Sequence, residues 1–148
     1  MRIFITGVAG FIGFFTARRL CLEGHTVTGV DNLNDYYDPN LKYARLQEMG
    51  VDRSSIVEHA TVSSRTMPNF QFCMSNVANR DQMEQLFGSG QFDYVIHLAA
   101  QAGVRYSVSN PHAYLDSNIT GHLNILECCR HYLVKHLVYA SSSSVYGL

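Results

Sequence analysis

The chain has 148 residues, of which 47% are apolar and 16% charged, so it can bury a packed core and is not a disordered chain. A formal net charge of -1 argues against nucleic acid as the main partner, because a phosphate backbone binds to basic surfaces. No apolar run approaches the roughly 18 residues that span a bilayer, and the N-terminus does not resemble a signal peptide, so no membrane partner is expected.

Short, continuous apolar runs alternate along the chain with longer segments of helical periodicity. Such runs are typical of strands that are covered on both faces, as in a parallel sheet. The runs predict strands at Arg2–Thr6, Thr26–Val30, Phe70–Met74, Tyr94–Leu98 and His136–Ala140. The periodic segments predict helices at Phe11–Glu23, Leu41–Met49, Arg80–Phe87 and Pro111–His131. The least patterned segment, Val51–Asn69, is expected to be a surface excursion.

This alternation predicts one α/β domain over residues 1–148. Strand–helix–strand units with right-handed crossovers give a Rossmann-like, doubly wound parallel sheet flanked by helices, and we expect the strand order 3-2-1-4-5. Two helix starts carry their own signals. Asn79 and Gln82 form a capping-box pattern, and Asn110 precedes a proline at the first helical position.

Cysteine and histidine usage bears on compartment and metal binding. The cysteines form no C-x-x-C pair and are expected to be reduced thiols in a cytoplasmic protein. The histidines have no metal-ligand spacing, so no metal site is expected.

A glycine-rich turn follows the first expected strand. Residues 6–13 read T-G-V-A-G-F-I-G, a G-x-x-G-x-x-G pattern. Gly7 permits the strand-to-helix turn, Gly10 lets the backbone approach a diphosphate, and Gly13 lets the helix pack closely on the strand. The helix N-terminus then presents free amides to the phosphates. The residues expected at the cofactor are Gly7, Gly10, Phe11, Ile12 and Gly13; the alternative is that three glycines only make a tight turn.

Asp31, at the end of the second expected strand, indicates which dinucleotide binds. An acidic residue here accepts hydrogen bonds from the adenosine ribose hydroxyls. A 2′-phosphate would instead meet a like charge, at a cost of about 4 kcal/mol for two unit charges about 4 Å apart near a surface. We therefore expect NAD rather than NADP; the alternative is a solvated turn aspartate.

Four segments carry a resemblance to a known family. They are D-N-L-N-D-Y-Y-D at residues 31–38, H-L-A-A-Q-A-G-V-R-Y-S at 97–107, D-S-N-I-T-G at 116–121 and L-V-Y-A-S-S-S-S-V-Y-G at 137–147. With the glycine loop, they resemble the UDP-glucuronate 4-epimerases and related nucleotide-sugar epimerases of the extended short-chain dehydrogenase/reductase family. The resemblance covers essentially the whole chain. It implies the NAD-binding part of an enzyme that interconverts UDP-glucuronate and UDP-galacturonate through a 4-keto intermediate.

The same resemblance implies roles for individual residues around the cofactor. Asn32 joins Asp31 at the ribose, and Asn76 and Val77 face adenine, although the family usually has Asp in place of Asn76 and Gly in place of Ser75. A carboxamide oxygen can still accept a hydrogen bond from the adenine amino group. Leu98, Ala99 and Ala100 match a turn that lines the cofactor. Asn118 matches a helix residue near the nicotinamide half; the alternative is a helix-interior polar residue that bonds locally.

The substrate side is implied by the serine-rich end of the last strand. Ser142 matches the active-site hydroxyl that positions the reacting 4-OH of the sugar. Ser143 and Ser144 match residues near the hexose and its carboxylate, and the alternative is a polar turn. Arg105 would reach a phosphate or a uronate carboxylate through a bidentate contact; a solvated loop arginine is an equal alternative.

The Tyr-x-x-x-Lys pair, which supplies the general base in the family, is absent: no tyrosine of the chain is followed four residues later by lysine. We therefore expect an incomplete domain without its substrate-binding region and with negligible turnover by itself. The last strand is expected to leave Leu137, Val138 and Tyr139 at an open sheet edge, which predicts self-association into a homo-oligomer.

Two other interpretations stay open. The same NAD domain could belong to another nucleotide-sugar 4-epimerase, a dehydratase or a decarboxylase. Alternatively, the chain is a non-catalytic NAD-binding module.

Overall fold

The structure is a computed structural model that describes residues 1–147, with Ser143 and Ser144 described by their backbone only. The main elements alternate along the chain and are β1 (Arg2–Thr6), α1 (Phe11–Leu22), β2 (Thr26–Asp31), α2 (Pro39–Glu48), β4 (Phe70–Met74), α3 (Arg80–Gly90), β5 (Tyr94–His97), α6 (His122–His131) and β6 (His136–Tyr139). Shorter elements are η1 (Arg53–Ser55), β3 (Thr61–Ser63), α4 (Val104–Ser109), α5 (Pro111–Tyr114), η2 (Leu115–Gly121) and η3 (Ser143–Tyr146).

The six strands form one sheet in the order β3-β4-β2-β1-β5-β6. All neighbours pair in parallel except β3, which runs antiparallel to β4. The five parallel strands confirm the predicted 3-2-1-4-5 order. Their predicted bounds are correct to within one residue. For β1, β2, β4 and β5 the reason is that the continuous apolar runs are the largely buried strands themselves, whereas β6 is mostly exposed.

Val51–Asn69 was predicted to be a surface excursion, and this is confirmed, because all of its residues except Val51 and Ser64 are exposed or half-buried. The excursion also contains structure that the sequence did not reveal, namely η1 and the edge strand β3. β3 has only three residues, and its burial pattern gives no apolar alternation that a sequence reading could detect.

The predicted helix Pro111–His131 is divided into α5, the π-helical turn η2 and α6, and α4 precedes it. The helix starts agree better with prediction. The Asn79 side chain accepts from the Gln82 amide at 3.1 Å, and the Asn110 side chain accepts from the Ala113 amide at 3.4 Å. The reciprocal half of the capping box is wrong, because the Gln82 side chain instead donates to the carbonyl of His59.

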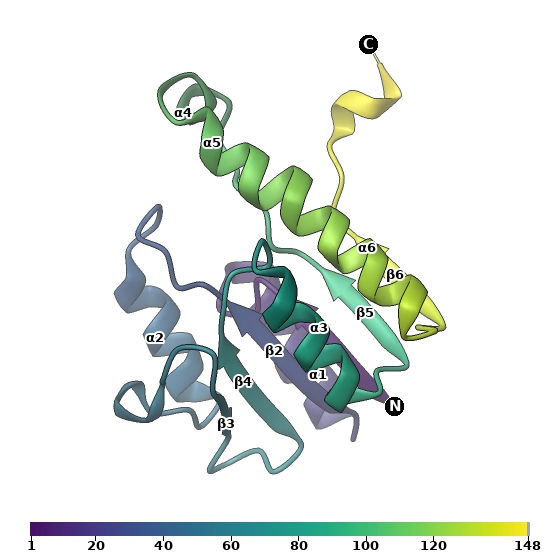
Figure 1. The fold of residues 1–148 in the computed structure, drawn as a ribbon. Coiled ribbons are helices and arrows are strands. Elements are labelled where there is room, and N and C mark those ends of the chain that lie inside the picture. The colour runs from purple at the N-terminus through teal and green to yellow at the C-terminus, as the bar shows by residue number, and fades with distance from the viewer. Residues whose placement is uncertain (148) are drawn as a thin grey trace.

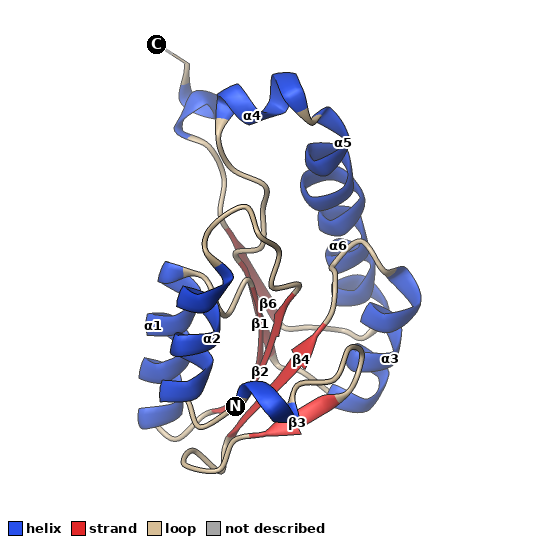
Figure 2. Cartoon of the chain, turned by 90° about the vertical axis from the view of Figure 1, so that its left-hand side faces the viewer, coloured by secondary structure: helices blue, strands red, loops and turns tan. Residues whose placement is uncertain are grey.

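Helices cover both faces of the sheet. α1 and α2 lie on one face and α3 and α6 on the other, as Figure 2 shows. Successive residues of β1 point to opposite faces, so Ile3 and Ile5 pack with Phe14 of α1, while Phe4 packs with Met83 of α3. All of these side chains are buried, which explains why a 12-residue helix with little amphipathic pattern such as α1 is nevertheless held firmly on the sheet.

The loops that leave the carboxyl ends of the strands gather at one end of the molecule, where α4, α5 and the C-terminal segment also lie (Figure 1). The chain reverses its winding direction at β1, which has β2 on one side and β5 on the other. In doubly wound sheets, ligands bind outside the carboxyl ends of the strands at this reversal. Among residues 1–147, no helix is long and apolar enough to cross a membrane.

Candidate functional site

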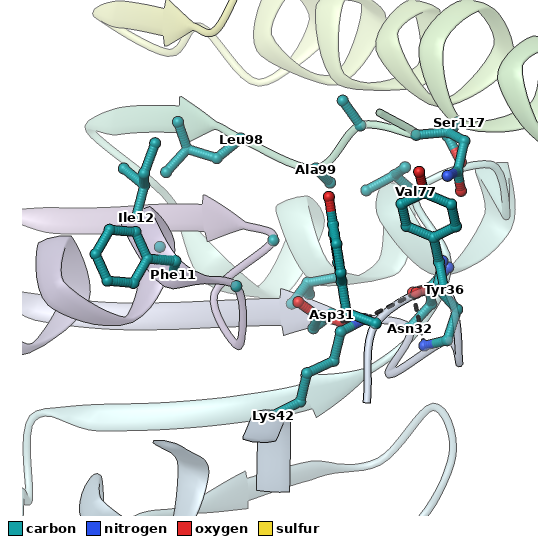
Figure 3. A pocket seen from close by; sticks show the side chains of 18 of the residues that line it. Phe11, Ile12, Asp31, Asn32, Tyr36, Lys42, Val77, Leu98, Ala99 and Ser117 are labelled. Atoms are coloured by element: carbon teal, nitrogen blue, oxygen red, sulfur yellow. Dashed lines mark hydrogen bonds and ion pairs between the residues drawn. The ribbon is translucent and has the colours of Figure 1, made fainter. Parts of the chain in front are cut away.

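A crevice of about 340 Å³ opens at the carboxyl ends of β1, β2 and β5. Its volume lies at the small end of the range for ligand sites. Phe11 and Ile12 of α1 stand on one side of it and Tyr36 and Ser117 on the other (Figure 3). Of the residues predicted at the cofactor, the crevice is lined by Gly7, Gly10, Phe11, Ile12, Gly13, Asp31, Asn32, Val77, Leu98, Ala99 and Ala100.

The glycine loop forms the floor of the crevice in a shape that only glycines allow. Gly7 has a φ of 71°, and a Cβ on Gly13 would collide with the Gly7 carbonyl oxygen. Gly10 is the N-cap of α1 and supplies no side-chain cap, so the first-turn amides of α1 are not covered by their own cap residue. Uncapped amides at a helix N-terminus attract anions, so the loop is shaped to hold a phosphate.

Asp31 lies in the crevice wall and is 7% exposed. Its carboxylate accepts from the amide of Ala9 at 3.1 Å and from the amide of Leu33 at 2.9 Å. The ammonium group of Lys42, also buried and also lining the crevice, lies 3.4 Å from Asp31 Oδ1 and donates to Asn34 at 2.9 Å. A carboxylate can accept about four hydrogen bonds, so Asp31 keeps capacity for a ligand hydroxyl.

Lys42 changes the electrostatics expected at Asp31. The sequence predicted an isolated negative charge, whereas in the structure Asp31 forms an ion pair with Lys42. A positive charge at this distance offsets much of the repulsion that Asp31 alone would exert on a 2′-phosphate. We therefore expect weaker discrimination between NAD and NADP than the isolated carboxylate predicts.

The segment directly after β4 contains Ser75, Asn76 and Val77. Val77 and Ser75 line the crevice, but Asn76 is not among the lining residues, and its side-chain oxygen accepts from the amide of Ala78 at 3.0 Å. The Ser75 hydroxyl is buried and has no hydrogen-bond partner among the described residues. The wall of the crevice therefore contains a polar group whose hydrogen-bonding capacity is unused in this structure.

Asn118 lies in the π-helical turn η2 and reaches the loop after β5. Its Oδ1 accepts from the amide of Gln101 at 2.8 Å, and its Nδ2 donates to the carbonyl of the same residue at 2.9 Å. These bonds join residues far apart in the sequence, so the local-bonding alternative does not describe them. Asn118 lines the second cavity described next.

A second cavity of about 620 Å³ adjoins the crevice. The two share the residues of the loop after β5 and the end of β6, which are Leu98, Ala99, Ala100, Gln101 and Ala140. Ser142 lines this second cavity. Arg105 is exposed and lines neither cavity. The side chains of Ser143 and Ser144 lie outside the described part of the chain.

His97 forms part of the wall of the second cavity, and its hydrogen bonds define which ring nitrogen carries the proton. Thr6 Oγ1 accepts from the amides of Leu98 and Ala99 at 3.2 Å and 3.0 Å, so its own proton is directed to His97 Nδ1, 2.6 Å away. His97 Nδ1 is then the acceptor, which leaves the ring proton on Nε2. Burial, with a smaller contribution from the charge of His122, lowers the pKa of His97 to about 4, so the ring is neutral at pH 7.

Several lining residues were missed at the sequence level. Tyr36 and Tyr37 lie in the D-N-L-N-D-Y-Y-D segment, whose position directly after Asp31 was a usable signal. Lys42 had no such signal, because it sits inside a helix and reaches the site only through the fold. The crevice is further lined by Asn34, Ser75, Gln101, Ser117 and Ala140. No group of three His, Cys, Asp or Glu side chains suited to a metal occurs in the described residues.

Comparisons with known proteins agree with this geometry. The model of the NAD dependent epimerase/dehydratase family matches residues 3–148. An uncharacterized 37.6 kDa protein from Escherichia coli O111:H- is 51% identical over all of this chain and 40% of its own length. A UDP-glucuronate 4-epimerase from Thermodesulfobacterium geofontis is 46% identical over 97% of this chain and 40% of its own length.

A solved structure extends the likeness to the fold. The UDP-glucose 4-epimerase of Thermus thermophilus, determined in complex with NAD, superposes with a TM-score of 0.70 at 31% identity. The alignment covers 96% of this chain and 38% of that one. The chain thus spans about two fifths of the length of the proteins that it matches.

Proposed function

Because the chain belongs to the NAD dependent epimerase/dehydratase family, we propose that it is the NAD-binding part of a UDP-sugar 4-epimerase. The observation that carries this proposal is the continuity of the two cavities. A crevice with a glycine floor and an uncapped helix N-terminus leads, past Ala99 and Ala100, into a larger cavity that reaches Ser142. A dinucleotide bound in the first would place its nicotinamide end toward the second.

The substrate pair proposed for the whole protein is UDP-glucuronate and UDP-galacturonate. The 46% identity to a UDP-glucuronate 4-epimerase supports it. So do the N-D-Y-Y-D and A-G-V-R-Y-S segments, which resemble this group of epimerases more narrowly than the glycine loop does. A cytoplasmic location is part of the proposal and is supported by the free thiols of the four cysteines, which persist in reducing compartments.

Bound NAD would supply a reversible hydride acceptor for C4 of the sugar. The residues of this chain would bind NAD and position the substrate. The glycine loop would bind the diphosphate, Asp31 would accept from the adenosine ribose, and Ser142 would position the 4-OH. The 148 residues contain no Tyr-x-x-x-Lys pair to remove the hydroxyl proton. Loss of such a group costs roughly 10²- to 10⁴-fold in rate, so we propose negligible turnover by this chain alone.

A second candidate function is a non-catalytic NAD-binding module. Both candidates require an NAD site at the crevice, so the first experiment tests that site.

Calorimetric titration of the chain with NAD and with NADP tests the crevice and the ion pair in its wall. We expect NAD to bind more tightly by roughly tenfold or more, a difference of about 1.4 kcal/mol. Asp31→Ala should remove most of this preference. Lys42→Met should increase it, because the ammonium group no longer offsets the repulsion between Asp31 and a 2′-phosphate.

Asp31→Ala removes a negative charge and Lys42→Met removes a positive charge, so the two variants are controls for each other. A variant whose fold is merely damaged would bind both NAD and NADP more weakly. Glu48→Gln, at the far end of α2 from the crevice, serves as a neutral control. Failure of NAD to bind at millimolar concentration would overturn the proposed function. Equal affinity for the two cofactors would refute the role of Asp31.

A further inference from the structure

Two loops that are distant in the sequence meet beside the crevice. One is the loop after β2, residues 32–38, and the other is the loop after β5, residues 98–103. The Tyr36 ring lies 4.9 Å from the Tyr106 ring, between centroids. The Tyr36 hydroxyl lies so close to Gly103 that any Cβ there would collide with it, and Gly103 has a φ of 94° that L side chains rarely adopt. Residue 103 therefore has to be glycine if Tyr36 is to keep this position.

The loop after β5 is also held from its other side. Asn118 of η2 bonds both the amide and the carbonyl of Gln101. The Tyr114 hydroxyl donates to the carbonyl of Ala102 at 2.8 Å and also contacts the carbonyl of Gly103. Residues 101–103 are thus clamped between η2 and Tyr36.

The segment that follows has few other attachments. α4 contains no buried residue, and its Val104 and Val108 are 86% and 85% exposed. Its ring contacts are those of Tyr106, to Tyr36 and to Tyr114. A short helix with so little burial has low local stability, so its position depends on the contacts at its start.

The tyrosine contact connects the two cavities. Tyr36 lines the crevice, opposite Phe11 and Ile12 (Figure 3), whereas Gly103 and Tyr114 line the second cavity. A ligand in the crevice would contact Tyr36 from inside, and Tyr36 in turn contacts Gly103 and Tyr106.

We propose that Tyr36 is a positioning residue that fixes α4, and with it Arg105, when a nucleotide fills the crevice. The proposal rests on the proposed function for the identity of the nucleotide. Occupancy of the cofactor site then orders a segment beside the substrate cavity, so that the second cavity reaches its binding shape only after the first is filled.

Hydrogen–deuterium exchange of the chain, with and without saturating NAD, tests this coupling. NAD should slow exchange of the amides of residues 103–109 by threefold or more in the unaltered chain. The slowing should disappear in Tyr36→Ala and persist in Tyr36→Phe, which keeps the ring. Tyr37→Ala is the matched control, because Tyr37 lines the same crevice and its ring contact is with Tyr36. Saturation is verified by calorimetry for each variant.

Gly103→Ala should displace the Tyr36 ring, because a Cβ at residue 103 would collide with the Tyr36 hydroxyl. It should therefore lose the slowing as Tyr36→Ala does, and agreement between the two variants guards against misfolding of one of them. Slowing that persists in Tyr36→Ala and Gly103→Ala, with NAD bound, would overturn the coupling and leave the proposed function intact. So would NAD binding without any slowing in the unaltered chain. Absence of NAD binding to the unaltered chain would overturn both.

Discussion

His97 is a buried histidine, and burial is the main cause of its lowered pKa of about 4, with a smaller contribution from His122. Thr6 accepts two backbone amides and directs its own proton to His97 Nδ1, so protonation of the ring would place two donors against each other. The same ring stacks on His122, with 5.2 Å between centroids. The neutral ring therefore suits both its burial and its hydrogen bond.

The lowered pKa of His97 predicts a loss of stability in mild acid. Between pH 6.5 and about 4 the unfolded chain binds a proton that the folded chain does not, so stability falls as the pH falls through this window. The loss should reach at most about 3 kcal/mol. Urea unfolding at a series of pH values measures it. His97→Asn, which keeps an acceptor for Thr6, should flatten the dependence, whereas His136→Asn on the exposed start of β6 should not.

Some residues of the crevice could be located from the sequence, and others could not. Gly7, Gly13 and Asp31 were predicted in the crevice because their spacing from one strand end fixes where they lie. Lys42 was not, because the position of a helical side chain relative to that strand depends on how α2 packs. Arg105 had two equal interpretations, a substrate contact or a solvated loop arginine, and its exposed position outside both cavities agrees with the second.

The π-helical turn η2 is the element that aims Asn118 at the loop after β5. A turn of this type inserts an extra residue into a helix and rotates the side chains that follow, and it occurs often at functional sites. The sequence predicted one continuous helix over Pro111–His131, since helical periodicity cannot register a single added residue. Tertiary contacts with Gln101 hold the turn in place.

Asn118→Asp should destabilise the chain, because a carboxylate cannot donate to the Gln101 carbonyl and would face it instead. The hydrogen bond is partly buried, and leaving it unmade costs roughly 1 kcal/mol or more. Thermal unfolding of the purified variant measures the change. Thr120→Ala, an exposed position of the same turn, is the control and should alter stability by less than about 0.5 kcal/mol. Equal stability of Asn118→Asp and the unaltered chain would contradict the clamp.

The architecture of the whole molecule followed from the alternation of strands and helices, and the order of its five parallel strands was predicted correctly. What the pattern did not reveal is β3, the short strand that covers the outer side of β4. Its three residues, Thr61–Ser63, include one apolar side chain, which is too few for a hydrophobic period to be detected. The other edge is β6, where Val138 and Tyr139 are 49% and 52% exposed.

The β6 edge predicts concentration-dependent self-association, since its unpaired backbone groups can bond another strand. Light scattering across a hundredfold range of concentration should show a rise in mean mass. Val138→Lys should reduce the association, because an edge lysine opposes strand pairing. Leu133→Lys, 85% exposed in the turn before β6, is the control. A monomer at every concentration would contradict the prediction.

β3 also limits what such an assembly can become. One border of the sheet is the three-residue edge strand β3, so each copy offers a single long border, the one along β6, within the described residues. Two copies that pair along β6 leave only the short β3 edges exposed, and very short edge strands are poor templates for further pairing. The aggregate should therefore stop at a two-fold symmetric pair and not grow into a fibre.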